Sequence, residues 1–180
     1  MTSAFDPTAL RVKAFAQAGA ALEGATPAQQ FERLLADCVD TVSAPVRWAA
    51  QGSTEKKAGS SDAIWLHLQA DAQVPLTCQR CLKPVLVNLL VDRDFRFVPD
   101  EATAMAEDDE AEEDLLVLSS EFDLLALVED ELLMDLPLVP MHEACESEHV
   151  PTSDDSGGPA VAENPNPFAV LAALKTKKSD

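Results

Sequence analysis

Cysteine is scarce in this chain of 180 residues. Secreted domains that depend on disulfides have a much higher cysteine density, so a disulfide scaffold is excluded, and the chain is long enough to bury a sizeable core without one. The start of the chain has no continuous apolar stretch of the kind found in signal peptides, because Arg11, Lys13 and Gln17 interrupt it. No stretch approaches the roughly 18 uninterrupted apolar residues of a membrane-spanning helix. We therefore expect a cytoplasmic protein.

Lysine and arginine are missing from residues 97–174, a span that holds 21 of the 32 acidic residues. Residues 1–98, by contrast, contain ten acidic and ten basic residues. Proteins bind nucleic acid by neutralising phosphates with Lys and Arg, so the acidic span is excluded as a surface for RNA. A direct RNA contact would have to come from the first half or the last six residues, and a basic protein partner would be attracted to the acidic half.

Short motifs of the common enzyme classes are also missing. The chain has no GxSxG, no P-loop, no GxGxxG and no HExxH. The run 100–114 holds nine acids in fifteen residues but lacks the glycine-centred spacing of a calcium loop. Because no other group of acids, bases and metal ligands supports a nuclease, we expect a noncatalytic protein.

Helical patterns occur in both halves of the chain. In the segment 26–39, Thr26 is an N-cap candidate, Pro27 takes the first helical position, and apolar residues follow at helical spacing. In the segment 123–135, Asp123 is the N-cap candidate and apolar residues again share one face. A third segment, 7–18, is also predicted to be helical, although its apolar face is thin. The three predicted helices are 7–18, 26–39 and 123–135.

Alternation of apolar and polar residues predicts two long strands. Residues 63–72 alternate with a period of two, and the pattern returns from Val85 to Phe97, with only Arg93 as an interruption. The segments 44–51 and 115–118 are weaker strand candidates. We predict an α+β fold in which an antiparallel sheet, with a CxxC motif at the tip of its central hairpin, is packed by two or three helices.

The domain organisation follows from composition. Residues 1–146 are predicted to form one α+β domain, in which 99–114 is a mobile acidic loop because its charges repel one another. Residues 147–163 have the composition of a flexible linker, and residues 164–180 read as a helical peptide motif, apolar and then basic. This motif would either bind a partner or dock back on the domain. Its candidate partner-binding residues are Phe168, Val170, Leu171 and Leu174.

The CxxC motif of Cys78 and Cys81 allows more than one chemistry. A redox pair is disfavoured, because its first thiol normally lies at a helix N-terminus, whereas Pro84 and a strand pattern follow here. A zinc site would place both thiolates about 2.3 Å from the ion and would need two further ligands, for which His142 and Cys145 are the candidates. Zinc binding and a pair of reduced thiols that only caps the hairpin both remain open.

Three blocks of the sequence together resemble one known family. They are CQRCLKP (78–84), FDLLALVEDELLMDLPLVPMHE (122–143) and NPNPFAVLAALK (164–175). In composition, order and spacing they are similar to the large ribosomal RNA subunit accumulation protein family, the YceD family of bacteria with relatives in plastids. The resemblance extends from about Thr26 to the C-terminus.

The resemblance implies a ribosome-biogenesis factor that supports the synthesis, processing or stability of large-subunit (23S) ribosomal RNA. Ribosomal proteins or rRNA-processing factors would be its partners, and the ribosomal RNA would be contacted directly or indirectly. The alternative is a zinc-knuckle protein that binds ribosomal RNA itself, through basic side chains near the CxxC motif. The candidate RNA-binding residues are Arg80, Lys83, Arg93 and Arg96.

Overall fold

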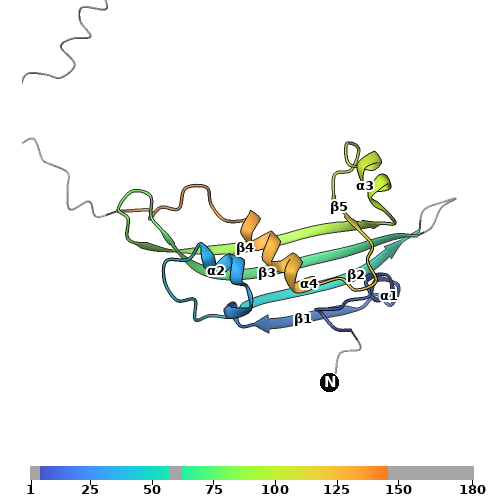
Figure 1. The fold of residues 1–180 in the computed structure, drawn as a ribbon, viewed down its shortest axis with the longest axis horizontal. Coiled ribbons are helices and arrows are strands. Elements are labelled where there is room, and N and C mark those ends of the chain that lie inside the picture. The colour runs from blue at the N-terminus through green and yellow to red at the C-terminus, as the bar shows by residue number, and fades with distance from the viewer. Residues whose placement is uncertain (1–4, 57–61, 146–180) are drawn as a thin grey trace, which may run out of the picture. The chain divides into compact units, whose positions relative to one another are not determined.

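A five-stranded sheet is the framework of the protein in a computed structural model that describes residues 5–56 and 62–145 (Figure 1). The strands lie in the order β1-β2-β3-β4-β5, antiparallel up to β4, whereas β5 is parallel to β4. The α+β class is confirmed, but the sheet is mixed rather than antiparallel, because the chain returns through a helix before it forms β5. The strands are β1 (Ala21–Thr26), β2 (Val46–Glu55), β3 (Ala63–Thr77), β4 (Pro84–Val98) and β5 (Asp114–Val117).

Strands β3 and β4 form the long centre of the sheet. They pair without interruption from Ile64 opposite Phe97 to Thr77 opposite Pro84. Their alternating apolar side chains are buried on one face, as the sequence pattern predicts. The CxxC motif lies in the connection between the paired residues Thr77 and Pro84.

Helices cover the apolar face of the sheet. Helix α1 (Val12–Gln17) packs against β2 and β3, helix α4 (Leu124–Met134) packs against β3 and β4, and helix α2 (Glu32–Ala36) packs against α4. Figure 1 shows α2 and α4 in front of the sheet. None of the helices in the described ranges is long and apolar enough to cross a lipid bilayer. The fully buried core side chains include Phe15, Phe31, Leu34, Leu66, Leu68, Phe95, Leu124 and Leu132.

The start of α4 confirms one predicted cap and the segment 26–39 corrects another. The Asp123 side chain accepts a hydrogen bond from the Ala126 backbone N–H at 3.0 Å, as an N-cap residue does. Thr26, however, is the last residue of β1, and its hydroxyl accepts from Trp48 Nε1 at 2.9 Å. A short 3₁₀ turn (Ala28–Gln30) separates it from α2. Sheet pairing therefore overrides the local preference for a cap.

The first turn of α2 is stabilised by a residue nearly one hundred positions away. Glu129 of α4 is buried and accepts hydrogen bonds from the backbone N–H groups of Arg33 and Leu34 at 2.8 and 3.2 Å. It also pairs with the Arg33 guanidinium at 2.9 Å. A carboxylate from a neighbouring helix thus satisfies N–H groups that a short helix leaves without partners.

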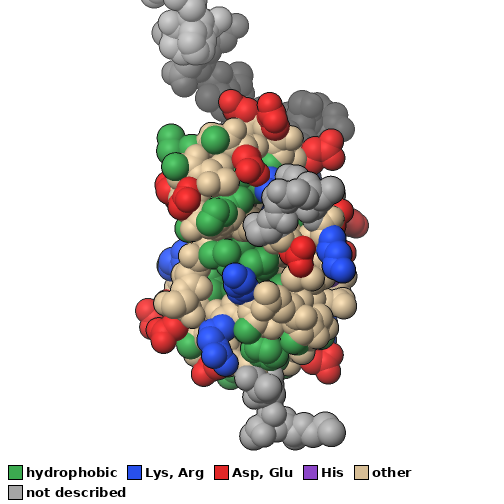
Figure 2. All heavy atoms as spheres, turned by 90° about the vertical axis from the view of Figure 1, so that its right-hand side faces the viewer, with side chains coloured by type: hydrophobic (Ala, Val, Ile, Leu, Met, Phe, Trp, Pro, Cys, Tyr) green, Lys and Arg blue, Asp and Glu red, His purple; other side chains and the backbone are tan. Residues whose placement is uncertain are grey.

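The acidic segment 99–114 corrects a further expectation, because it contains regular structure. Helix α3 (Glu101–Glu107) begins at Asp100, whose side chain accepts from the Thr103 N–H at 2.8 Å. Arg96 of β4 pairs with Glu107 at 2.7 Å and with Glu113. Figure 2 views this end of the molecule and shows acidic side chains gathered in its upper part. An arginine from the neighbouring strand offsets the repulsion that composition alone suggests.

The described elements belong to one compact unit, Met1–Glu146. The predicted linker (147–163) and the predicted peptide motif (164–180), with its candidate partner-binding residues, lie outside the described residues.

Candidate metal centre

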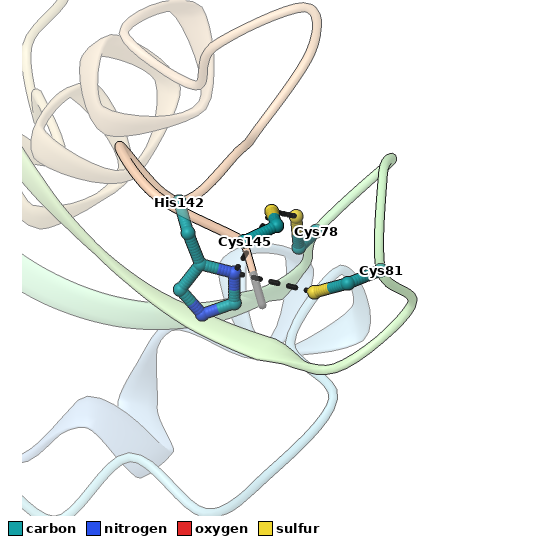
Figure 3. Close-up of side chains that lie close together, drawn as sticks. All are labelled: Cys78, Cys81, His142 and Cys145. Carbon is teal, nitrogen blue, oxygen red and sulfur yellow. Dashed lines mark hydrogen bonds between the residues drawn. The ribbon is translucent and has the colours of Figure 1, made fainter. Parts of the chain in front are cut away.

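Two segments far apart in sequence bring four potential metal ligands together. Cys78 and Cys81 come from the β3–β4 connection, and His142 and Cys145 come from the segment 136–145 that follows α4, which we call the strap (Figure 3). One ligand atom from each residue lies within 4.8 Å of all the others. The thiols and the imidazole point toward one another (Figure 3). The structure therefore unites the four residues that spacing suggested, in an arrangement that could hold a metal ion.

Three of the six separations among these atoms lie close to the edges of a tetrahedron of zinc ligands. Bonds of about 2.3 Å to sulfur and about 2.0–2.1 Å to nitrogen imply S···S edges of about 3.8 Å and S···N edges of about 3.6 Å. The Sγ atoms of Cys78 and Cys145 lie 3.5 Å apart. His142 Nδ1 lies 3.4 Å from the Cys81 Sγ and 3.9 Å from the Cys145 Sγ. The other three separations are at most 4.8 Å, so these ligand atoms would have to move closer together to bind one ion.

The orientation of His142 is fixed by its other ring nitrogen. Nε2 lies 3.0 Å from the Pro84 carbonyl oxygen, which can only accept a hydrogen bond. Nε2 therefore carries the proton and donates, and the Nδ1 lone pair points to the thiols. Metal-binding histidines generally have such a partner on the nitrogen that does not bind the ion. This supporting contact is to a backbone carbonyl and has no signal in the sequence.

Backbone hydrogen bonds hold the hairpin tip and the strap in place. The Cys78 N–H donates to the Lys83 carbonyl at 3.0 Å, and the Gln79 N–H donates to the Pro140 carbonyl of the strap at 2.9 Å. Leu82, directly after the second cysteine of the motif, has a φ of 59°. This left-handed conformation costs a residue with a Cβ about 1–2 kcal/mol, so the tip retains some backbone strain next to a ligand.

The charges of the site call for a cation. Burial acts to raise the pKa of the Cys78 thiol, but hydrogen bonds from the backbone N–H groups of Cys81, His142 and Arg80 lower that pKa to about 5. Burial and the nearby sulfurs of Cys78 and Cys81 raise the pKa of Cys145. Within the described ranges, the side-chain hydrogen bonds of these sulfurs are to one another and to His142, and none comes from a Lys or Arg. A positive ion would relieve the repulsion among them.

The predicted RNA-binding residues do not form one cluster. Arg80 and Lys83 are exposed at the hairpin tip. Arg93 and Arg96 lie on β4, about 30–40 Å further along the strand at about 3.3 Å per residue. Arg93 pairs with Asp114 at 3.2 Å and lies 3.7 Å from a Glu131 oxygen, while Arg96 binds two glutamates. The grouping of all four beside the CxxC motif is therefore wrong, because a long strand separates them.

Fold and site together define an α+β protein with a Cys₃His group that could hold a metal ion. A family model described as "Large ribosomal RNA subunit accumulation protein YceD" matches residues 66–175. A Haemophilus influenzae protein of that name is 35% identical over 159 residues, which cover 83% of this chain and 84% of the relative. No solved structure matches the chain significantly. The chain belongs to the YceD family.

Proposed function

We propose that this protein supports the accumulation of large-subunit ribosomal RNA as a noncatalytic ribosome-biogenesis factor of the cytoplasm. Membership of the YceD family supports the role, since the name of its relative describes that outcome. Family membership is the observation that carries the role, and the Cys₃His group supports a structural rather than a catalytic use of this site. Four protein ligands leave a tetrahedral ion no free position for a substrate or a reactive water.

Zinc is the ion that we assign to this centre. Three thiols, one imidazole and tetrahedral spacing form a donor set that suits zinc and is typical of structural zinc sites. The ligand atoms would be the Sγ atoms of Cys78, Cys81 and Cys145 and Nδ1 of His142. The bound ion would join the strap to the hairpin tip, a cross-link that the chain otherwise makes with a few hydrogen bonds.

The proposed direct partner is a basic ribosomal protein or an rRNA-processing factor. The span 97–174 holds 21 acidic residues and no Lys or Arg. Such a surface attracts positively charged proteins at long range and repels polyanions. By binding a basic ribosomal protein, or by competing with RNA for one, the acidic half would keep that protein available until the new ribosomal RNA is ready.

Affinity purification of the tagged full-length chain tests this proposal. We expect ribosomal proteins to be recovered at low salt and released at high salt, because screening weakens contacts between exposed charges. Mass spectrometry of the bound proteins, with and without residues 164–180, would identify the partners and show whether that segment captures them. A partner set free of ribosomal proteins would contradict the proposal.

Direct RNA contact through the hairpin tip is the second candidate. In the described part of the chain, Arg80 and Lys83 are exposed and have no ion-pair partner, unlike Arg93 and Arg96. Reversing both charges to Glu should abolish crosslinking to ribosomal RNA if the tip binds it. Reversing Arg11 and Lys13 to Glu changes the net charge equally and serves as the control. Unchanged crosslinking of the tip variant would exclude this candidate.

A further inference from the structure

Strand β4 leaves part of its outer edge open beside the strap. On this side β5 pairs only with Phe95–Val98. In the earlier part of the strand, the Leu90 N–H points away from β3 and donates to Asp135 Oδ2 at 2.8 Å. Backbone groups of an antiparallel strand alternate in direction, and the register of β4 with β3 is unbroken, so even-numbered residues of β4 direct their N–H and C=O groups outward.

Two contacts mark the limits of the open stretch. Asp135, just before the strap, accepts from the Leu90 N–H, and His142 of the strap donates to the Pro84 carbonyl. Between them lie Leu86 and Asn88, whose outward backbone groups have no hydrogen-bond partner within residues 5–56 and 62–145. An edge with free N–H and C=O groups is a template for another strand.

A groove lies next to this edge. It has a volume of about 710 Å³ and runs between β4 at residues 85–87 and the strap at residues 137–144. Its apolar side chains are open to solvent: Leu86 is 64% exposed and Val139 55%, and the neighbouring Leu138 is 99% exposed. Large apolar side chains gathered on a surface commonly mark a site of protein interaction.

The charges around the groove select a positively charged occupant. Asp135 lies just before the strap, and Glu143 lines the groove. Asp92 and Asp94 lie further along the same strand beside His67, and the exposed Lys83 lies two residues before Val85 at the hairpin tip. The strap itself contains no Lys or Arg. An extended segment that enters the groove would therefore meet apolar walls and several negative charges.

We propose that this groove binds a short extended segment of a basic polypeptide, which adds a strand to the open edge of β4. The backbone of the segment would pair with Leu86 and Asn88, and its alternate apolar side chains would contact Leu86 and Val139. This inference rests on the proposed function, since it gives the basic partner a place to bind. The strap forms one wall of the groove, so a loaded metal centre would be required for full affinity.

Titration of the full-length, zinc-loaded protein with the labelled peptide KVRVKVRVK tests the inference by fluorescence anisotropy. We expect saturable binding that weakens at least about tenfold in Asn88→Pro, a loss of about 1.4 kcal/mol. Proline removes the outward N–H of residue 88 without removing a hydrogen bond to β3. Asn88→Ala keeps that N–H and should bind almost normally. Zinc content and far-UV circular dichroism would establish that both variants fold.

Further probes keep the inference falsifiable if Asn88→Pro does not fold. Val139→Lys should weaken binding by charge repulsion, and a KVRVKVRVK peptide N-methylated at alternate residues should not bind, because it cannot complete the strand pairing. Equal binding of the N-methylated peptide, or of the acidic peptide EVEVEVEVE, would overturn the inference.

Two other occupants would also overturn it. Dimers in native mass spectrometry that are lost in Val139→Lys would assign the groove to a second copy of the chain. Peptide binding that occurs only after removal of residues 147–180 would assign the groove to that segment.

If Asn88→Pro no longer binds the peptide but retains its ribosomal proteins, the groove is not their site and the proposed function stands. If the peptide binds as expected but ribosomal proteins are not recovered, the proposed function fails instead.

Discussion

The two ends of β4 gather negative groups and stabilise them in opposite ways. At the α3 end, Arg96 lies between Glu107 and Glu113, so the protein provides its own cation. At the hairpin tip, three cysteine sulfurs and one imidazole converge, and within the described chain their side-chain hydrogen bonds are to one another rather than to a Lys or Arg. The first arrangement is complete within the polypeptide, whereas the second would be completed by the zinc ion that we propose. Stability at the tip should therefore depend on metal, and stability at the α3 end should not.

Loss of one thiolate should have the largest effect. We expect Cys78→Ser to lower zinc affinity by at least about 100-fold, because ligand binding supplies much of the free energy that orders a small metal site. Competition with a chromophoric chelator measures the affinity, and hydrogen exchange should show opening of residues 78–83 and 136–145.

Cys38→Ser is the matched control for this prediction. The Cys38 thiol lies outside the cluster and contacts the Leu34 carbonyl at 3.4 Å, a contact that serine can also make. The zinc content of the Cys38→Ser variant should equal that of the wild type. Full zinc occupancy in Cys78→Ser would contradict the assignment of the centre.

Removal of the Arg96 charge should have a smaller effect on stability, and this effect should be confined to the α3 end of β4. We expect Arg96→Gln to lower the free energy of unfolding by about 2 kcal/mol, because two half-buried glutamates lose their charged partner. Urea unfolding measures this change, and zinc content should not alter. Arg47→Gln, which removes an exposed pair with Asp71, should have little effect. An equal loss of unfolding free energy in both variants would show that the Arg96 ion pairs stabilise the fold no more than an exposed pair does.

Relief of backbone strain at the tip is a subtler test. Leu82 is 75% exposed and has a left-handed backbone, so its side chain contributes little packing. We expect Leu82→Gly to raise the unfolding free energy by up to about 1 kcal/mol, and Leu82→Val to lower it by a similar amount, since β-branched residues tolerate this conformation poorly. Thermal unfolding of the zinc-loaded protein measures both. The opposite order would rule out strain at this position.

Acidification should lower the stability of the α3 end, and we expect this effect to be the smallest of the predicted effects. Hydrogen bonds from the Thr103 N–H and hydroxyl lower the pKa of Asp100, and the Arg96 guanidinium lowers the pKa of Glu113. Both carboxyls stabilise the fold above their ordinary pKa values of 3.8 and 4.5, and this contribution is lost as the pH falls through the lowered values.

An NMR titration from about pH 6 to about pH 3 would follow this loss. Amide signals of α3 and β5 should shift and broaden before those of β3. Simultaneous loss of the amide signals of α3, β5 and β3 would show that the α3 end does not unfold separately from the rest of the sheet.

Local patterns in the sequence predicted the parts of the fold that depend on neighbouring residues. Alternation of apolar side chains, interrupted only at Arg93, identified β3 and β4, because a strand with one buried face favours it. Asp123 identified the start of α4, because an N-cap acts within one helical turn. The two pairs of metal ligands were also visible, since each pair has a short spacing in the chain.

Features that depend on distant residues were missed or wrongly predicted. Arg96 turns an acidic run, predicted as a loop, into a segment with helix α3, and Glu129 determines where α2 begins. Thr26 has the sequence of a cap but pairs in β1. In each case a partner from another part of the chain outweighs the local preference, and single-sequence patterns contain no information about that partner.

The sequence by itself determined the class of fold and the uneven distribution of charge, and it suggested the four thiol and imidazole residues that could hold a metal ion. Tertiary structure alone decided that these four residues converge, that Arg93 and Arg96 bind carboxylates of this chain, and that part of β4 has no strand partner among the described residues. The physical reason is range: periodicity and caps act over a few residues, whereas ion pairs, metal sites and sheet edges depend on which distant segments the folded chain brings together.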